Sequence, residues 1–254
     1  MFVDDLGEPV PLAASPTRVV SLVPSLTDAI ETSRPGLLAG VTDYCTHPPH
    51  LNVPRVGGSK YPNVDAVLDL RPDLVVANAE ENRPEDVARL RADGIPVWVT
   101  AAAPTVPDGL GSVRRLLTQA LALTEPDWLV AAEDAWRTPE PVWATAVIPV
   151  WRRPWVVIGR DTFAGDVLHR LGVANVYATH EDRYPRPPLA ALTSAGADLV
   201  VLPDEPYEFT ATDGPESFPD LPYALVNGRH LTWCGPSLAE AHRTLKVALR
   251  AHLV

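Results

Sequence analysis

Short runs of Val, Ile and Leu alternate with helical patterns along almost the whole chain, and this alternation restricts the possible folds more than any other feature. Each apolar run has the length of a strand, is rich in β-branched residues and ends in a polar loop, whereas the segments between the runs repeat apolar residues at helical spacing. This order is typical of strand–helix–strand units that build a parallel sheet. We therefore expect an α/β protein.

The run Asp-Leu-Val-Val occurs at residues 73–76 and again at 198–201, and both copies lead into a loop that carries acidic residues. The elements around the two copies follow a similar order, which predicts two lobes of one plan with the repeated run as the same strand in each lobe. The predicted strands lie within 18–25, 37–49, 73–82 and 95–100 in the first lobe, and within 155–160, 174–185, 197–209 and 223–233 in the second.

The segment between the two sets of strands reads as helical. Apolar residues recur at helical spacing over roughly 107–123, and residues 125–137 continue as a second helix, which Pro139, Pro141 and Pro149 end. We expect an N-terminal α/β lobe at 1–106, a helical connector at 107–142 and a C-terminal α/β lobe at 143–254.

Composition excludes several classes of partner. The net charge of −11 argues against nucleic acid and against anionic membrane surfaces. The two cysteines form no CxxC pair, so neither a disulfide scaffold nor a zinc knuckle is encoded. The start of the sequence lacks the basic and apolar regions of an export signal, which predicts a cytoplasmic protein, or a periplasmic or extracellular one if such a signal has been removed.

The unusual residues of this chain lie where ligands bind to open parallel sheets, beyond the carboxyl ends of the strands. If the lobes face one another, these loops line one cleft. The sequence shows no local motif for a dinucleotide, a P-loop, an α/β-hydrolase nucleophile or a zincin metal site. The carboxyl-end residues are Pro24, Ser25, Tyr44, Cys45, Thr46, His47, Glu80, Glu81, Asn82, Arg160, Asp161, Thr162, Glu181, Asp182, Arg183, Tyr184, Glu205, Tyr207, Trp233 and Cys234.

Several of these residues have a structural interpretation beside the functional one. His47 either contacts a ligand or caps its own loop, and Cys45 is more typical of a small buried side chain than of a metal ligand. One of Glu80 and Glu81 is expected to cap the helix that follows, while the other faces the cleft.

The loop at 160–162 and four aromatic residues can likewise be interpreted either as structural or as ligand-binding. Asp161 or Thr162 is a natural N-cap, which leaves Arg160 free to reach a ligand. The side chains that could either stack on a planar ligand or belong to the core are Tyr44, Tyr184, Tyr207 and Trp233. Trp151 and Trp155 are interpreted as packing residues.

Five segments resemble, in order, those of the class III substrate-binding proteins of ABC transporters, the helical-backbone metal-receptor group, and most closely its vitamin B12-binding branch. They span nearly the whole chain. The segments are RVVSLVPSLTDAI, GVTDYCTHPP, RVGGSKYPNVDAVLDLRPDLVVANAEEN, IGRDTFAGDVLHRLG and DEPYEF.

This resemblance implies two Rossmann-like lobes with parallel sheets, joined by a rigid connecting helix. It also implies a cleft that holds a metal chelate such as cobalamin, haem or a ferric siderophore as ligand rather than as intrinsic cofactor. The contact residues that it implies are Tyr44, His47, Lys60, Glu81, Arg160, Tyr184, Glu205, Tyr207 and Trp233.

The chain departs from this family at the expected transporter contacts. Exported relatives place an acid near the start of a surface helix in each lobe; Asp65 fits, but Ala190 stands where the second acid is expected. Together with the missing export signal, this departure suggests a cytoplasmic relative that binds its ligand without docking to a permease. The alternatives are a protein-binding module without ligand and a cytoplasmic enzyme that reuses the cleft to process a small molecule, with His47, Cys45, Glu81 and Asp182.

Overall fold

In the computed structural model, which describes residues 2–251, the chain forms two compact units. Unit 1 consists of the residues up to Ala102 together with Asp108–Val130 and Cys234–Pro236. Unit 2 consists of Ala103–Pro107, Ala131–Trp233 and the residues from Ser237 onward. Each unit contains a four-stranded parallel sheet, which confirms the predicted α/β class.

The sheet of unit 1 has the strand order β4-β3-β5-β6. Helices connect its strands in the predicted alternation. These elements are β3 (Val19–Ser21), α1 (Pro24–Ser33), β4 (Leu38–Val41), α2 (Val64–Asp69), β5 (Leu74–Asn78), α3 (Pro84–Ala92) and β6 (Val97–Thr100).

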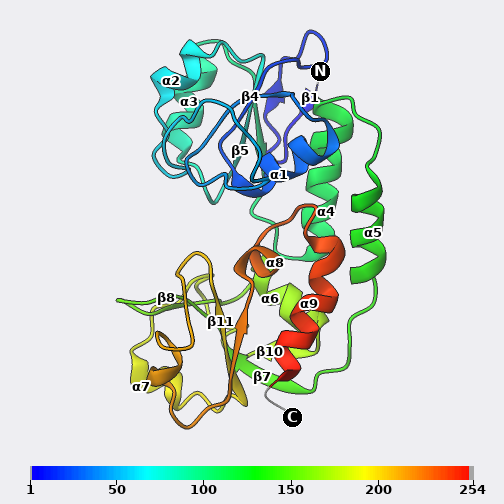
Figure 1. Cartoon of the computed structure of the whole chain (residues 1–254). Helices are drawn as coiled ribbons and strands as arrows, with labels where there is room; N and C mark the ends of the chain where they lie inside the picture. The colour runs from blue at the N-terminus through cyan, green and yellow to red at the C-terminus, as the bar shows by residue number, and fades with distance from the viewer. Residues whose placement is uncertain (1, 252–254) are drawn as a thin grey trace. The chain divides into compact units, whose positions relative to one another are not determined.

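Alternate residues of each strand in unit 1 bury opposite faces of the sheet, because successive side chains of a strand point to opposite sides. Val75 and Ala77 pack with α2 and α3, which lie together beside the sheet at the upper left of Figure 1. Leu74 and Val76 pack with α1 and with residues 113–121 on the other face. The sheet is therefore covered on both faces, as parallel sheets require.

The sheet of unit 2 has the strand order β10-β7-β11-β12. Helix α9 contacts β12, and α6 contacts β10. The elements of this unit are β7 (Ala144–Val147), β8 (Pro149–Trp151), β9 (Val156–Val157), α6 (Phe163–Arg170), β10 (Val173–Asn175), α7 (Leu189–Thr193), β11 (Leu199–Pro203), a short 3-10 turn (Pro215–Ser217), β12 (Tyr223–Val226), α8 (Gly228–Thr232) and α9 (Leu238–Arg250).

The repeated run forms β5 in unit 1 and β11 in unit 2, and each takes the third place in its sheet. The aspartate of each run performs the same task at the amino end of its strand. Asp73 accepts hydrogen bonds from the amide and hydroxyl of Thr17 at 2.7 and 2.8 Å, and Asp198 accepts the same pair from Thr145 at 2.7 and 2.8 Å. The prediction that the two runs are equivalent strands is confirmed.

The structure corrects the first strand predicted for the second lobe. Residues 155–160 contribute only β9, which pairs antiparallel with β8 in a separate two-stranded sheet. The corresponding strand of the parallel sheet is β7. It begins at Ala144, eleven residues before Trp155, where the predicted strand begins. The sequence pattern missed it because Ala-Thr-Ala-Val is short and only weakly apolar.

Two further helices lie between the sheets in sequence. Helix α4 (Val106–Arg115) continues into a π-helical turn (Leu116–Ala120), and α5 (Asp127–Trp136) follows, close to the helices predicted at 107–123 and 125–137. The predicted boundaries between the lobes and a connector stay predictions. Across residues 2–251, none of the helices combines the length and apolar character needed to cross a bilayer.

Candidate functional site

The carboxyl end of the unit 1 sheet carries the loop Ala79–Asn82, which follows β5, and the loop around Lys60. Lys60 Nζ donates to the carbonyl of Glu80 at 3.3 Å, so the two loops are in contact. Burial and the neighbouring charge of Glu80 raise the pKa of Glu81 to about 7, while the charge of Lys60 opposes this effect. Near neutral pH, Glu81 is therefore a carboxyl group that can both donate and accept a proton.

Asn78 and Asn82 give this loop its conformation. The side-chain oxygen of Asn78 accepts from the amides of Glu80 and Glu81 at 2.8 and 3.3 Å. The side-chain oxygen of Asn82 accepts from the amide of Asn78 at 2.8 Å, in the reverse direction. These paired bonds turn the chain sharply after β5 and fix the backbone at both glutamates.

Asn82 also joins three loops at this edge of the sheet. It is 3% exposed, and its side-chain nitrogen donates to the carbonyl of Leu22 at 3.2 Å and to that of Ser59 at 2.8 Å. The segments after β3 and before α2 are thereby tied to the loop after β5. Sequence reasoning placed Asn82 in this region but gave it no role, because its partners lie 60 and 23 residues away.

Two exposed tyrosines of unit 1 lie in the same group of loops. Tyr44 is 66% exposed and Tyr61 is 70% exposed. The Tyr61 ring lies 4.7 Å from the guanidinium of Arg83, and Tyr44 lies where a Cβ on Gly58 would meet its ring at 3.4 Å. Tyr61 was not predicted as a site residue, although its place directly after Lys60 in the sequence could have indicated it.

His47 and Cys45 follow β4 but differ in burial. The hydroxyl of Thr46 lies 3.1 Å from His47 Nδ1, and His47 is partly exposed. Cys45 is fully buried, and its sulfur lies 3.1 Å from the hydroxyls of both Thr27 and Thr42. Burial raises the pKa of the Cys45 thiol, and Cys45 is the small buried side chain that the sequence favoured.

In unit 2, Glu205 and Trp233 are in contact. Burial and the charge of Asp204 raise the pKa of Glu205, and a hydrogen bond from Trp233 opposes that change. Trp233 is 9% exposed, and the Arg229 guanidinium lies 5.6 Å from its ring. Trp233 is therefore mostly buried. It donates a hydrogen bond to Glu205, and little of its ring is accessible for stacking on a ligand.

The backbone of Glu205 approaches α8 closely at Gly228. A Cβ at Gly228 would lie 2.5 Å from the Glu205 amide nitrogen, which leaves no room for any other residue type. The amide of Gly228 donates to the side chain of Asp204 at 2.6 Å. This contact fixes the loop after β11 against the start of α8.

Arg160 and Tyr184 belong to two loops that pack together. The amide of Gly159 donates to the carbonyl of Arg183 at 2.8 Å, and the Arg183 guanidinium donates to the carbonyl of Asp161. Arg160 is exposed and pairs with Asp161 at 2.6 Å, while Tyr184 is 38% exposed.

Tyr207 lies in an aromatic cluster with the β8–β9 hairpin. Its hydroxyl donates to Asp213 at 2.6 Å, and its ring meets Trp151 edge-on at a centroid distance of 5.7 Å. Trp155 stacks on Phe209 at 6.1 Å, which confirms its packing role. Trp151 is 45% exposed, so its ring is only partly a packing element.

Two predicted helix starts have different outcomes. Thr162 caps α6 by accepting from the amide of Gly165 at 3.3 Å, as expected. Helix α3 instead begins at Pro84 after Arg83, without a side-chain cap, so the expectation that Glu80 or Glu81 caps it is wrong. The turn after β5 already holds both glutamates before the helix begins.

The two positions discussed for transporter contact lie on short helices. Asp65 is in the first turn of α2, is 74% exposed along its side chain, and pairs with Arg89. Ala190 is in α7, whose first turn contains no acid. Between residues 2 and 251, no group of three or more His, Cys, Asp and Glu side chains is arranged to hold a metal ion.

Two curated proteins are similar in sequence to this chain. The vitamin B12-binding protein of Vibrio cholerae is 32% identical over 83 residues, which cover 32% of this chain and 30% of that protein. The cobalamin-binding protein of Halobacterium salinarum is 29% identical over 208 residues, which cover 76% of this chain and 55% of that protein. The chain thus matches less than two thirds of the length of each relative. No protein-family profile matches it.

Solved structures show the same fold. The periplasmic haem-binding protein RhuT of Roseiflexus sp., in its apo form, has a TM-score of 0.77 at 22% identity and covers 95% of this chain and 100% of its own. The periplasmic vitamin B12-binding protein BtuF of Vibrio cholerae has a TM-score of 0.71 at 18% identity, with coverage of 94% and 98%.

These similarities confirm the resemblance predicted from the sequence, to substrate-binding proteins and their vitamin B12-binding branch. The names of the relatives state binding and no reaction, so the enzymatic alternative gains no support. The two solved proteins are periplasmic, and the predicted cytoplasmic location is likewise without support. The individual contact residues stay predictions.

Proposed function

We propose that this protein binds a corrinoid of the cobalamin type, or a similar metal chelate such as haem, as a ligand that it carries and does not transform. The observation that carries the proposal is the 29% identity over 208 residues to a cobalamin-binding protein. The haem-binding relatives of the same fold keep haem within the ligand class to be tested.

The chemistry of the unit 1 edge supports this ligand class. A chelate with a large ring system and polar side chains needs flat apolar contacts and several hydrogen-bonding groups. Exposed Tyr44 and Tyr61 supply ring faces, and Lys60 supplies a cation. Glu81, whose pKa lies near 7, can donate a hydrogen bond to an amide or carboxylate oxygen of the ligand.

We propose a second set of ligand contacts in unit 2. Exposed Arg160 is the cation of this set, and Tyr184 and Tyr207 supply partly exposed rings. Glu205 is the acidic contact, held in place by Trp233 and by the close approach of Gly228.

Titration with three probes tests the proposal: cyanocobalamin, dicyanocobinamide and haemin, each followed by tryptophan emission and by the visible spectrum. We expect saturable binding of at least one probe at micromolar concentration. Absence of any saturable change up to the high micromolar range for all three would refute the proposed ligand class.

Arg160→Ala tests the contact residues, and Arg137→Ala is its matched control. Both arginines are exposed and pair with a neighbouring aspartate, Arg160 with Asp161 and Arg137 with Asp134. If Arg160 contacts the ligand, its loss weakens binding by about tenfold, the effect of one charge-assisted hydrogen bond, and Arg137→Ala leaves the affinity unchanged. Equal effects of the two substitutions would remove Arg160 from the site.

We also propose that this chain does not use a pair of surface acids to dock to a permease. Ala190 supplies no carboxylate in α7, and Asp65 is already paired with Arg89. Fractionation of cells of the source organism tests this proposal: recovery with the periplasmic or extracellular fraction would remove the reason for a permease-independent role.

A further inference from the structure

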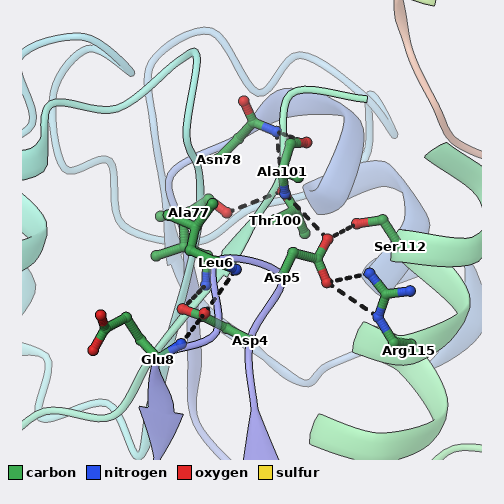
Figure 2. A network of polar contacts seen from close by, with 11 residues as sticks. Asp4, Asp5, Leu6, Glu8, Ala77, Asn78, Thr100, Ala101, Ser112 and Arg115 are labelled. Carbon is green, nitrogen blue, oxygen red and sulfur yellow. Dashed lines mark hydrogen bonds and ion pairs between the residues drawn. The ribbon is translucent and has the colours of Figure 1, made fainter. Parts of the chain in front are cut away.

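The N-terminal hairpin of unit 1 places a buried carboxylate against the end of β6. Strands β1 (Phe2–Val3) and β2 (Pro9–Val10) form the hairpin, and Asp5 lies in its turn region. The Asp5 side chain is 1% exposed; it accepts from the amide of Ala101 at 3.1 Å, from the hydroxyl of Ser112, and from Arg115 at 2.6 Å. Figure 2 shows this carboxylate between the end of β6 and helix α4.

Ala101, whose amide bonds to Asp5, and its neighbour Thr100 are bonded in turn to Asn78, at the end of the neighbouring strand. The side-chain nitrogen of Asn78 donates to the hydroxyl of Thr100 at 3.0 Å and to the carbonyl of Ala101 at 3.1 Å. The Thr100 hydroxyl donates to the carbonyl of Ala77 at 3.1 Å. Both donor positions of the Asn78 amide are thus used on the end of β6 (Figure 2).

The acceptor atom of the same Asn78 amide holds the backbone of Glu80 and Glu81, at 2.8 and 3.3 Å. The Asn78 side chain is planar, so its donors and its acceptor cannot be reoriented independently. The position of Ala101, which Asp5 sets, therefore fixes the direction in which Asn78 presents its oxygen to the loop Ala79–Asn82.

We propose that Asp5 is a positioning residue for the loop Ala79–Asn82, and that it acts through Ala101 and Asn78 to hold the backbone of Glu81 in place for ligand binding. This inference rests on the proposed function for the role of Glu81. The relay from Asp5 to the loop is a claim about this chain alone and can be tested without any ligand.

Asp4 provides a matched control in the same hairpin. Its side chain is also fully buried, pairs with Arg91 at 2.8 Å, and accepts from the amides of Leu6 and Glu8 at 2.9 and 3.0 Å. It reaches β6 only at the amide of Val99, at 3.3 Å, and has no bond to Thr100 or Ala101. Substitution at Asp4 therefore disturbs the hairpin and one bond to Val99, but it removes no bond to Thr100 or Ala101, the two residues that Asn78 contacts.

The test compares Asp5→Asn with Asp4→Asn in the full chain, using hydrogen exchange of the Glu80 and Glu81 amides measured by NMR. We expect Asp5→Asn to accelerate exchange of both amides by at least about fivefold, the factor for one hydrogen bond of ordinary strength. Asp4→Asn should leave this exchange unchanged relative to other amides of the sheet. Equal acceleration in the two variants, or none in either, would overturn the proposal.

The pKa of Glu81, measured by pH titration, provides a second readout. A general loss of stability does not change this pKa as long as the protein stays folded. Burial raises the pKa of this carboxyl to about 7, so release of the loop should lower the midpoint in Asp5→Asn and not in Asp4→Asn. The variant Asn78→Asp keeps an acceptor for the two amides but removes the donors to β6. In that background Asp5→Asn should have no further effect on exchange; an undiminished effect would show another route and overturn the relay.

Binding of cyanocobalamin separates this inference from the proposed function. We expect Asp5→Asn to weaken binding by about fivefold or more and Asp4→Asn to leave it within a factor of about two. If the parent binds none of the chelates while the exchange pattern holds, the relay stands and the ligand class fails. If the parent binds cyanocobalamin and the two variants lose affinity equally, Asp5 has no positioning role.

Discussion

Replacement of Glu81 by Gln should remove a specific pH dependence of stability. The pKa of Glu81 is about 7 in the folded chain against an ordinary value of 4.5, so the folded state holds a proton that the unfolded state releases between these values. The free energy of unfolding contributed by this group is fully present below pH 4.5 and is lost as pH rises through 7. At about 1.4 kcal/mol per pKa unit, this difference sets an upper limit of about 3.5 kcal/mol on the loss, and solvent screening at this partly exposed side chain makes the loss smaller.

The assay is urea unfolding at a series of pH values from 5 to 8.5, followed by tryptophan emission. The stability of the parent should fall relative to Glu81→Gln across this range, and above pH 7 the Gln variant should be the more stable protein. Glu80→Gln should move the transition to lower pH by removing a repelling charge, and Lys60→Met should move it to higher pH. Parallel stability curves for the parent and Glu81→Gln would refute the reasoning.

Three further predictions concern other parts of the molecule. Asn82→Asp removes two donors at a 3% exposed position and should lower the free energy of unfolding by about 2–4 kcal/mol, measured by chemical denaturation. Gly228→Ala forces a Cβ to within 2.5 Å of the Glu205 amide nitrogen and should lower it by about 1–3 kcal/mol, with no such loss for Gly111→Ala, whose Cβ would meet nothing. Burial raises the pKa of Cys45, and that of Cys234 to about 12, so neither thiol should react with iodoacetamide at pH 8 until the chain is unfolded, as mass spectrometry can show.

The sequence predicted the architecture well where strand composition and loop placement agree. The Asp-Leu-Val-Val runs are apolar, β-branched and bounded by turns, and both became central strands in equivalent places. It failed for 155–160, because strand propensity indicates an extended segment but not the partner with which that segment pairs. The residues that form β7 carry too little apolar character to be recognised before the sheet is assembled.

The site was predictable only to the level of loops. The rule that ligands bind beyond the carboxyl ends of parallel strands drew attention to the Glu81 and Glu205 loops, which do follow β5 and β11, while their part in ligand binding stays a prediction. It could not show that the Tyr207 hydroxyl is bonded to Asp213, that Trp233 is covered, or that Asn82 and Asp5 hold distant loops. The bond from Ala101 to Asp5 spans 96 residues, and no local pattern records a contact at that separation.

The residues Cys234–Pro236 lie within unit 1 although the chain on both sides of them belongs to unit 2. Cys234 packs against the apolar core that contains α1, and a Cβ on Gly235 would lie 3.2 Å from the carbonyl of Ser25. No single break in the gene therefore separates the two units, because a fragment that ends before residue 234 lacks this piece of unit 1. Efforts to express unit 1 alone, to graft it onto another protein or to label it separately would have to supply this three-residue piece from the far end of the chain.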